Sequence, residues 1–339
     1  MGLKKSLSRL FEAAALILLL VTIASCFTEE NRYFELLSHF KNQYFYSALL
    51  LVAIFVVLKS IRGAALALVA LLVSGIAVLP VYFQEPKSYS PVASSAQIKV
   101  MLSNVLSSNT QYQKLIDYIL QESPDILVLQ ELDHNWISNL SPVIQRYPTN
   151  IIIPRNDNFG IAVLSKLQPV DQQITYWGDL DIPSIEARLK INGHEFHVLA
   201  THPMPPTSAA NYRFRNRQLA DVAARASEIR SPKLLVGDLN ITTWSSDYDQ
   251  LEENTGFRNA RYGFGTFPTW PQQIPFIKIP IDHILVSREF DVKTISTGPN
   301  IGSDHLPLTV VLRLHNEQPI SPVNESQQEA FKALDRNLR

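Results

Sequence analysis

The stretch DILVLQE at residues 125–131 decides the fold class of this chain. Its apolar run has the length of a strand that is buried on both faces, and it ends in a glutamate. Before it stand TQYQKLIDYILQ (110–121), with apolar residues at helical spacing, and the β-branched stretch IKVMLSN (98–104). Strand, helix and strand in this order predict an α/β domain.

The same alternation continues along the chain to residue 314. We expect a short helix near 134–145 and a long helix over 209–229. Further strands are expected at 161–166, 184–191, 194–201, 233–239, 281–287 and 307–314. Asn192-Gly193 between two of these strands is typical of a hairpin turn. The pattern therefore predicts an α/β sandwich with mixed sheets over residues 97–314.

Residues 1–83 are much more apolar than the rest of the chain. Apolar runs at 10–27, 42–58 and 63–83 approach the roughly 20 residues that a helix needs to cross a bilayer. We expect three transmembrane helices here, because the alternative, a buried helical hairpin, does not account for three such runs. Residues 84–96, rich in Pro and Ser, are predicted to form a linker, and 315–339 a polar C-terminal tail.

The positions of lysine and arginine predict how these helices are oriented. Lys4, Lys5 and Arg9 precede the first run, and Lys59 and Arg62 lie between the second and the third. Both sites are expected to be cytoplasmic. Three crossings then place the α/β domain on the periplasmic, extracytoplasmic side of a multi-pass inner (plasma) membrane protein.

Cys26 is the only cysteine of the chain. It excludes an intramolecular disulfide and a cysteine-based zinc site. A basic start, an apolar stretch and Ile23-Ala24-Ser25 before this cysteine also resemble a lipoprotein signal, so a lipidated Cys26 is an alternative to an ordinary cysteine near a helix end. Either alternative leaves the predicted topology downstream unchanged.

The charge of the domain does not indicate a nucleic-acid-binding protein. The chain has 30 Lys and Arg and 31 Asp and Glu, of which residues 86–339 hold 23 basic and 26 acidic side chains. Domains that grip duplex nucleic acid usually present a basic face. A local basic patch remains compatible with this balance.

Polar side chains stand where the predicted strands end or begin. They are Asn104, Glu131, His202, Asp238, Asn240, Asp304 and His305. Each has an ordinary structural explanation on its own, such as a helix cap or a hydrogen-bonded buried histidine. Ligand sites of α/β proteins lie at strand ends, however, and packing does not explain why five separate segments deliver such residues there.

The residue types suit one kind of chemistry. Mg²⁺ or Mn²⁺ prefers carboxylate and amide oxygens, and would polarise a phosphoryl oxygen. The candidate ligands are Asn104, Glu131, Asp238 and Asp304. His305 is the candidate general base on water, and Asp282 is the candidate carboxylate that holds it.

Seven motifs follow one another along residues 97–314. They are SNV (103–105), DILVLQE (125–131), FGIAVLSK (159–166), ATH (200–202), VGDLN (236–240), IDHILVS (281–287) and SDHLPL (303–308). In this order they resemble the endonuclease/exonuclease/phosphatase superfamily, which includes deoxyribonucleases, apurinic endonucleases, sphingomyelinases and inositol polyphosphate phosphatases. The resemblance, to a membrane-anchored bacterial member, implies a four-layer αββα sandwich and metal-dependent hydrolysis of phosphoester bonds.

The resemblance also implies a role for each matching residue on the metal side. Asn104 and Glu131 resemble the family's metal-site pair, and Asp304 resembles a further acid beside it. Asp238 and Asn240 resemble the pair that positions water, phosphate and a second metal where there is one.

On the phosphate side, His305 resembles the histidine paired with the attacking water, and Asp282 the acid that orients it. His202 resembles a phosphate-stabilising histidine, where some members carry tyrosine. Asn158 matches a position that lines the site, although members vary there.

Two segments are candidates for substrate binding. Arg213 and Arg217 are four residues apart on a predicted helix and share a face, which would hold a phosphate or simply be solvated. The segment GTFPTWPQQIPFIKIP (265–280) has four prolines, and with Trp270 it is a candidate for a rigid apolar wall that stacks a base, touches lipid or packs on the core.

The leading hypothesis is therefore a divalent-metal-dependent phosphodiesterase of endonuclease-like type. The alternatives are a lipid or small-molecule phosphoesterase, which is sphingomyelinase-like, and a non-catalytic membrane-tethered binding module. The last is disfavoured because every matching position is filled. The expected partners are the membrane and a phosphoester substrate, which is a nucleic acid, a phospholipid or a small phosphate ester, and no obligate protein partner is evident.

Overall fold

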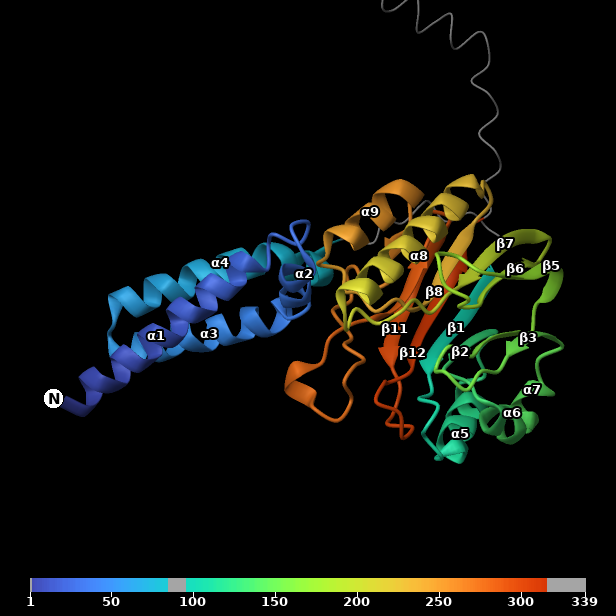
Figure 1. Ribbon diagram of the computed structural model, residues 1–339, viewed down its shortest axis with the longest axis horizontal. Helices are drawn as coiled ribbons and strands as arrows, with labels where there is room; N and C mark the ends of the chain where they lie inside the picture. Colours follow the sequence, from blue (N-terminus) through green and yellow to red (C-terminus); the bar gives the residue numbers. More distant parts are fainter. Residues whose placement is uncertain (1, 85–95, 316–339) are drawn as a thin grey trace, which may run out of the picture.

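The computed structural model describes residues 2–84 and 96–315, which form a helical bundle and an α/β sandwich set end to end (Figure 1). Residues 85–95 of the predicted linker and 316–339 of the predicted tail lie outside the described residues. The bundle contains α1 (Gly2–Ala24), α2 (Arg32–Ser38), α3 (Lys41–Leu58) and α4 (Ile61–Phe83).

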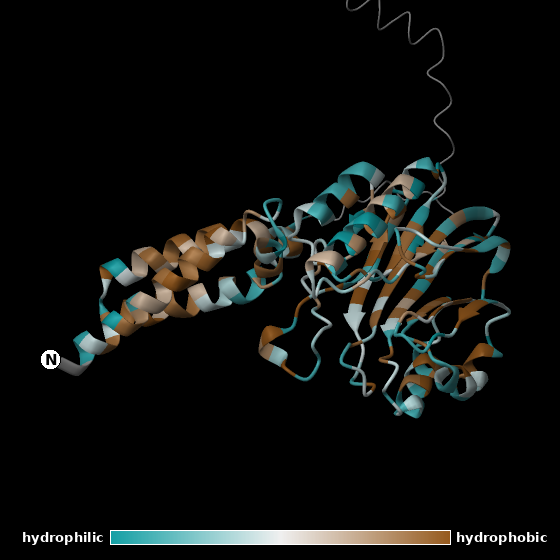
Figure 2. Ribbon diagram, in the orientation of Figure 1, coloured by the Kyte–Doolittle hydropathy of each residue, from teal (hydrophilic) through white to brown (hydrophobic). Residues whose placement is uncertain are grey.

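Three of these helices are long and apolar enough to cross a membrane, over Lys4–Ala24, Lys41–Leu58 and Ile61–Phe83. Their middle parts are coloured largely hydrophobic in Figure 2. The first helix begins before the predicted run, because the lysines and arginine ahead of it are also good helix formers, and it ends at Ala24 rather than at residue 27. Cys26 lies exposed just beyond this end, and its lipidation stays a prediction.

The basic residues at the two predicted cytoplasmic sites lie together. Lys4, Lys5, Arg9, Lys59 and Arg62 all line one cavity at the end of the bundle remote from the sandwich. This clustering agrees with the charge pattern that predicts a cytoplasmic side.

The short helix α2, which the sequence pattern did not predict, connects α1 with α3. The side chain of Asn31 caps it by accepting hydrogen bonds from the backbone N–H groups of Tyr33 and Phe34. At only seven residues it is too short for a periodic signal.

Two six-stranded mixed sheets form the centre of the sandwich. The first has the order β11-β12-β1-β2-β4-β3, with bounds Phe290–Thr297, Leu308–Leu314, Ala96–Asn104, Ile126–Gln130, Ile161–Ser165 and Thr149–Ile153. The second has the order β5-β6-β7-β8-β10-β9, with bounds Gln168–Thr175, Ser184–Ile191, His194–Ala200, Lys233–Asp238, Asp282–Val286 and Arg258–Asn259.

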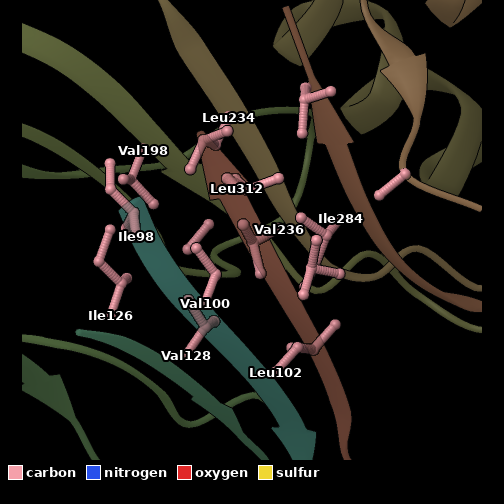
Figure 3. Packing of buried hydrophobic residues seen from close by; sticks show 14 of the residues in the cluster. Ile98, Val100, Leu102, Ile126, Val128, Val198, Leu234, Val236, Ile284 and Leu312 are labelled. Carbon is pink, nitrogen blue, oxygen red and sulfur yellow. The ribbon is translucent and has the colours of Figure 1, made fainter. Parts of the chain in front are cut away.

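Apolar side chains fill the space between the two sheets (Figure 3). Ile98, Val100 and Val128 come from the first sheet, and Val198 and Val236 from the second. Helices α5 (Tyr112–Glu122), α6 (His134–Asn139) and α7 (Ser141–Ile144) cover the outer face of the first sheet, and α8 (Ala209–Glu228) and α9 (Ser246–Thr255) that of the second. The predicted α/β sandwich is therefore confirmed, and its layers are helix, sheet, sheet and helix.

The strands that the sequence pattern missed are β3, β5, β9 and β11. Nearly all of β5 is exposed at a sheet edge, so its sequence QPVDQQIT has no apolar alternation. In β11 a bulge between Val292 and Thr294 interrupts the two-residue period.

Strand directions bring the polar segments to one edge of the sandwich. β1 and β2 are parallel, as are β7 and β8, so their carboxyl ends share an edge within each sheet. β12 is antiparallel to β1, and β10 is antiparallel to β8, so their amino ends reach the same edge. Within the second sheet, Asp238 and Asp282 are direct cross-strand partners.

The bundle is bonded to the sandwich near this edge. Trp244 donates its indole N–H to the carbonyl oxygen of Ala77 at 3.1 Å, and the backbone N–H groups of Gly263 and Gly265 donate to the carbonyl oxygen of Val81. These contacts pack the last turns of α4 against the sandwich and fix how this strand edge is oriented relative to the bundle.

Candidate active site

Three of the four predicted metal-site residues are in contact at the strand edge. The amide nitrogen of Asn104 donates to Glu131 Oε1 at 2.9 Å and lies 3.4 Å from Asp238 Oδ2. The amide oxygen of Asn104 accepts from the backbone N–H of Leu106 at 3.1 Å. Asn104 therefore orients the carboxylates, and their oxygens, rather than its own, face the site.

A cavity of about 500 Å³ opens above these carboxylates. Its polar lining includes Glu131, Asn158, His202, Asp238, Asn240, Asp304 and His305. These seven residues were all singled out from the sequence, and the fold brings them to one cavity although Glu131 and His305 are 174 positions apart.

His305 is held between two carboxylates. Its Nδ1 lies 2.8 Å from Asp282 Oδ2, and its Nε2 lies 3.6 Å from Asp238 Oδ2. Asp238, Asp282 and His305 each place one possible metal-ligand atom within 4.8 Å of the other two, a spacing that would also suit a bound cation. We interpret the trio as a hydrogen-bonded relay, because the short Nδ1 contact fixes the imidazole on Asp282 and leaves Nε2 toward the cavity.

These carboxylates control the charge of both histidines. Burial disfavours the imidazolium of His305, but the charges of Asp282 and Asp238 outweigh it and raise the pKa of His305 to about 10. Burial also lowers the pKa of His202, but the hydrogen bond and the charge of Asp238 outweigh burial and raise this pKa above its usual value. Burial raises the pKa of Asp238 in turn, but the two histidines more than offset it and the net shift is downward.

Three of the lining residues have a left-handed backbone. The φ angles of Glu131, Asn158 and Asn240 are +61°, +67° and +52°. Asparagine tolerates this region, but for glutamate it is unfavourable and is retained where the surroundings fix it. Here the backbone turn at Glu131 follows β2 directly and aims its carboxylate at Asn104.

Two supporting residues were not predicted. Gln130 bridges the sheets, since its side chain donates to the carbonyl oxygen of Thr201 and accepts from the backbone N–H of Asp238, both at 2.8 Å. The hydroxyl of Ser303 donates to the carbonyl oxygen of Asn104 at 2.9 Å and accepts from the N–H of His305 at 3.0 Å. Gln130 could have been recognised from the sequence, because it is a polar residue at the end of an otherwise apolar strand.

Trp270 joins the apolar wall to the acidic floor. Its indole N–H donates to Asp304 Oδ2 at 2.9 Å, and its ring lies 6.3 Å from that of His305, centroid to centroid. The other carboxylate oxygen of Asp304 is buried and has no hydrogen-bond partner among the described residues.

Arg213 and Arg217, predicted as phosphate contacts, do not line this cavity. Both side chains are exposed on α8, and Arg217 pairs with Asp221 at 3.3 Å. The arginine between them, Arg215, faces inward and is fully buried, because the helical repeat turns it to the opposite side.

Helix α2 and the residue that follows it supply a wall of the cavity through Leu36 and His39. Arg215 forms an ion pair of 2.9 Å with Glu35, and His39 Nδ1 lies 3.0 Å from the hydroxyl oxygen of Thr242. Burial next to the Arg215 charge lowers the pKa of His39 to about 3, so this wall carries a neutral imidazole.

The donor set fits a hard divalent cation. Oxygens of Glu131, Asp238 and Asp304 face one cavity, and an unpartnered buried oxygen of Asp304 is a group that a cation would satisfy. No cysteine lies at the site, which disfavours a soft metal.

Comparison with known proteins agrees with the fold and with the family that the motifs resemble. A model of the Endonuclease/Exonuclease/phosphatase family matches residues 101–305, more than half of the chain. Among solved structures, a family protein from Bacteroides vulgatus has 20% identity and a TM-score of 0.55, with 65% of this chain and 100% of that one covered.

Two further structures show the same likeness. A family protein from Bacteroides thetaiotaomicron has 19% identity and a TM-score of 0.55, covering 66% of this chain and 100% of that one. D. rerio TDP2 complexed with single strand DNA product has 16% identity and a TM-score of 0.54, covering 64% and 99%. The match over residues 101–305 decides the assignment: the chain belongs to the endonuclease/exonuclease/phosphatase family.

Proposed function

We propose that this phosphoester hydrolase is a membrane-anchored, divalent-metal-dependent phosphodiesterase that attacks phosphorus with a water activated by His305. The observation that carries the proposal is the buried imidazole held by Asp282 at 2.8 Å, at the floor of a carboxylate-lined cavity. A general base needs this arrangement, because the carboxylate fixes the tautomer and orientation of the ring.

In this proposal Glu131, Asp238 and Asp304 hold Mg²⁺ or Mn²⁺, and Asn104 keeps Glu131 in place. When bound, the cation polarises a phosphoryl oxygen and neutralises charge on the departing oxygen. Asp238 and Asp304 contribute to the raised pKa of His305, so a cation held by these two carboxylates would lower that pKa, while Asp282 would still hold the ring.

The remaining polar residues receive positioning roles. His202 lies 3.5 Å from Asp238 through its Nε2, and the raised pKa of this histidine favours the imidazolium form, which suits a non-bridging phosphate oxygen. Asn240 is fixed by donating to the carbonyl oxygen of Pro203 at 3.0 Å, and with Asn158 it lines the cavity where water and phosphate would lie.

The anchor belongs to the same proposal. The clustered basic residues at the distal end of the bundle support a cytoplasmic location for that end. The sandwich, at the opposite end, is then extracytoplasmic, on the periplasmic side of the inner membrane.

The test is hydrolysis of bis-p-nitrophenyl phosphate by the full chain in detergent. We expect turnover with Mg²⁺ or Mn²⁺, none after chelation, and a loss of about 10²–10⁴-fold in kcat for His305→Ala. His134→Ala, at an exposed histidine in α6, is the matched control and should keep full activity. Near-normal turnover by a folded His305→Ala variant would refute the proposed base.

A further inference from the structure

The cavity has an apolar side as well as its polar floor. Leu36, Phe159, Met204, Trp270 and Ile279 are among the residues of this apolar side. A phosphate group needs only the carboxylate and histidine floor, so the apolar wall indicates a substrate with an apolar arm next to the phosphate. No lysine or arginine is among the residues that line the cavity in the described part of the chain, whereas nucleic-acid grooves depend on such cations.

The mouth of the cavity is placed against the helical bundle. Leu36 lies on α2 and His39 directly follows it, between two of the helices that are apolar enough to cross a membrane. Arg32, at the start of α2, donates to the carbonyl oxygen of Thr207 on the opposite rim at 3.4 Å. One side of the cavity is therefore formed by the segment that connects two of these helices.

The loop of residues 271–280 exposes apolar side chains beside the helical bundle. Phe276 is 88% exposed and Ile274 50% exposed, and neither lines the cavity. Gln43, in the first turn of α3, donates to the carbonyl oxygen of Lys278 at 2.7 Å, which places the loop beside the end of a membrane-spanning helix. In Figure 1 the segment with the 3-10 turn Pro275–Ile277 extends from the sandwich toward the bundle, and Figure 2 colours it hydrophobic.

We propose that the substrate is a phospholipid-type phosphodiester of the membrane that holds the chain, and that Ile274 and Phe276 enter the lipid surface. This inference rests on the proposed function and names its substrate class. Trp270 connects the two regions, because it lies in the cavity wall, donates to Asp304 and precedes the loop.

The reaction balances as a simple hydrolysis. The oxygen of water bonds to phosphorus, one P–O ester bond breaks, and the departing alkoxide becomes an alcohol. His305 takes one proton from the water and returns it to the alkoxide, and the products are the alcohol and a phosphate monoester.

The experiment compares one enzyme on two substrates. The full chain is reconstituted into vesicles of equal parts phosphatidylethanolamine and phosphatidylglycerol, and release of phosphorylated headgroup or of diacylglycerol or phosphatidic acid is measured with Mg²⁺. The same preparation is assayed on soluble bis-p-nitrophenyl phosphate. We expect Ile274→Ser with Phe276→Ser to lower vesicle hydrolysis about 10-fold or more, because two side chains lose their burial in lipid. Turnover of the soluble diester should change less than about 2-fold, since neither residue lines the cavity.

Strand β5 offers a matched control. Ile174 is 48% exposed and Tyr176 53% exposed, and β5 lies at the end of the sandwich away from the bundle in Figure 1. Ile174→Ser with Tyr176→Ser should change neither activity. A loop variant that acts like this control, or that loses both activities equally, would overturn the inference.

The wild-type enzyme separates the two proposals. If it turns over the soluble diester but leaves vesicle lipid intact, or prefers a single-stranded oligonucleotide, the lipid inference fails while the proposed function stands. If it turns over no phosphodiester with Mg²⁺ or Mn²⁺, the proposed function itself fails.

Discussion

The buried ion pair between Glu35 and Arg215 joins helix α2 to helix α8 of the sandwich, and breaking it should be costly. Both residues are fully buried, and Arg215 Nη1 lies 2.9 Å from Glu35 Oε1. The same guanidinium nitrogen donates to the carbonyl oxygen of Asn240 at 3.0 Å, so the pair also supports the site. We predict the outcome of a double-mutant cycle with Glu35→Met and Arg215→Met.

The magnitude follows from the burial of both charges. Removing one partner of a buried pair costs about 3–5 kcal/mol, because the other charge is left without compensation, whereas apolar replacement of both is near neutral. Asp247 lies 3.5 Å from Arg215 and compensates part of its charge in Glu35→Met, so this variant should lie at the low end. Burial raises the pKa of Glu35 even beside Arg215. In Arg215→Met the carboxyl therefore takes up a proton, and the cost should fall as the pH is lowered.

We expect a coupling energy of at least about 2 kcal/mol, from free energies of unfolding of the full chain in detergent followed by tryptophan fluorescence. The control is Arg217 and Asp221, on the same helix α8, with side chains 58% and 29% exposed and a separation of 3.3 Å. For this exposed pair we expect about 0.3–0.5 kcal/mol. Equal coupling in the two cycles would refute the reasoning, since burial would then confer no additional strength.

Two further predictions concern the metal site and acid stability. Trp270→Phe removes the N–H that Asp304 accepts at 2.9 Å, so the Mg²⁺ concentration for half-maximal activity should rise about 10–100-fold. Trp244→Phe, whose N–H goes to Ala77 instead, should leave it unchanged, and an unaltered Mg²⁺ dependence in Trp270→Phe would contradict the role. Burial of Glu186 opposes its charge, but hydrogen bonds with His197 and Arg225 outweigh this and lower its pKa to about 2. A lowered folded-state pKa stabilises the fold above the unfolded pKa near 4.3, and this contribution is lost as the pH falls toward about 2. Glu186→Gln should therefore cost about 1–2 kcal/mol at pH 7, allowing for the part-exposed Arg225, and much less near pH 2. Urea unfolding that shows the same cost at both pH values would contradict this.

The sequence alone was sufficient for the fold class and for much of the candidate site. Buried strands such as Ile126–Gln130 show continuous apolar runs, and residues at their ends, such as Glu131 and Asp238, are local features of the chain. The three long apolar helices could be predicted for the same reason, since a helix that crosses a bilayer needs about 20 apolar residues in succession. These are properties of short stretches, which need no knowledge of what lies beside them.

Tertiary structure decided everything that depends on neighbours distant in sequence. Only the packing of α8 shows that Arg215 turns inward to Glu35 while Arg213 and Arg217 remain exposed. Likewise, only the fold places Leu36 and His39 in the cavity wall and sets the loop with Phe276 beside the bundle. The free energies of burial and of ion pairing depend on contacts that form only on folding. A local sequence pattern shows which side chains are present, but not which of them will be in contact.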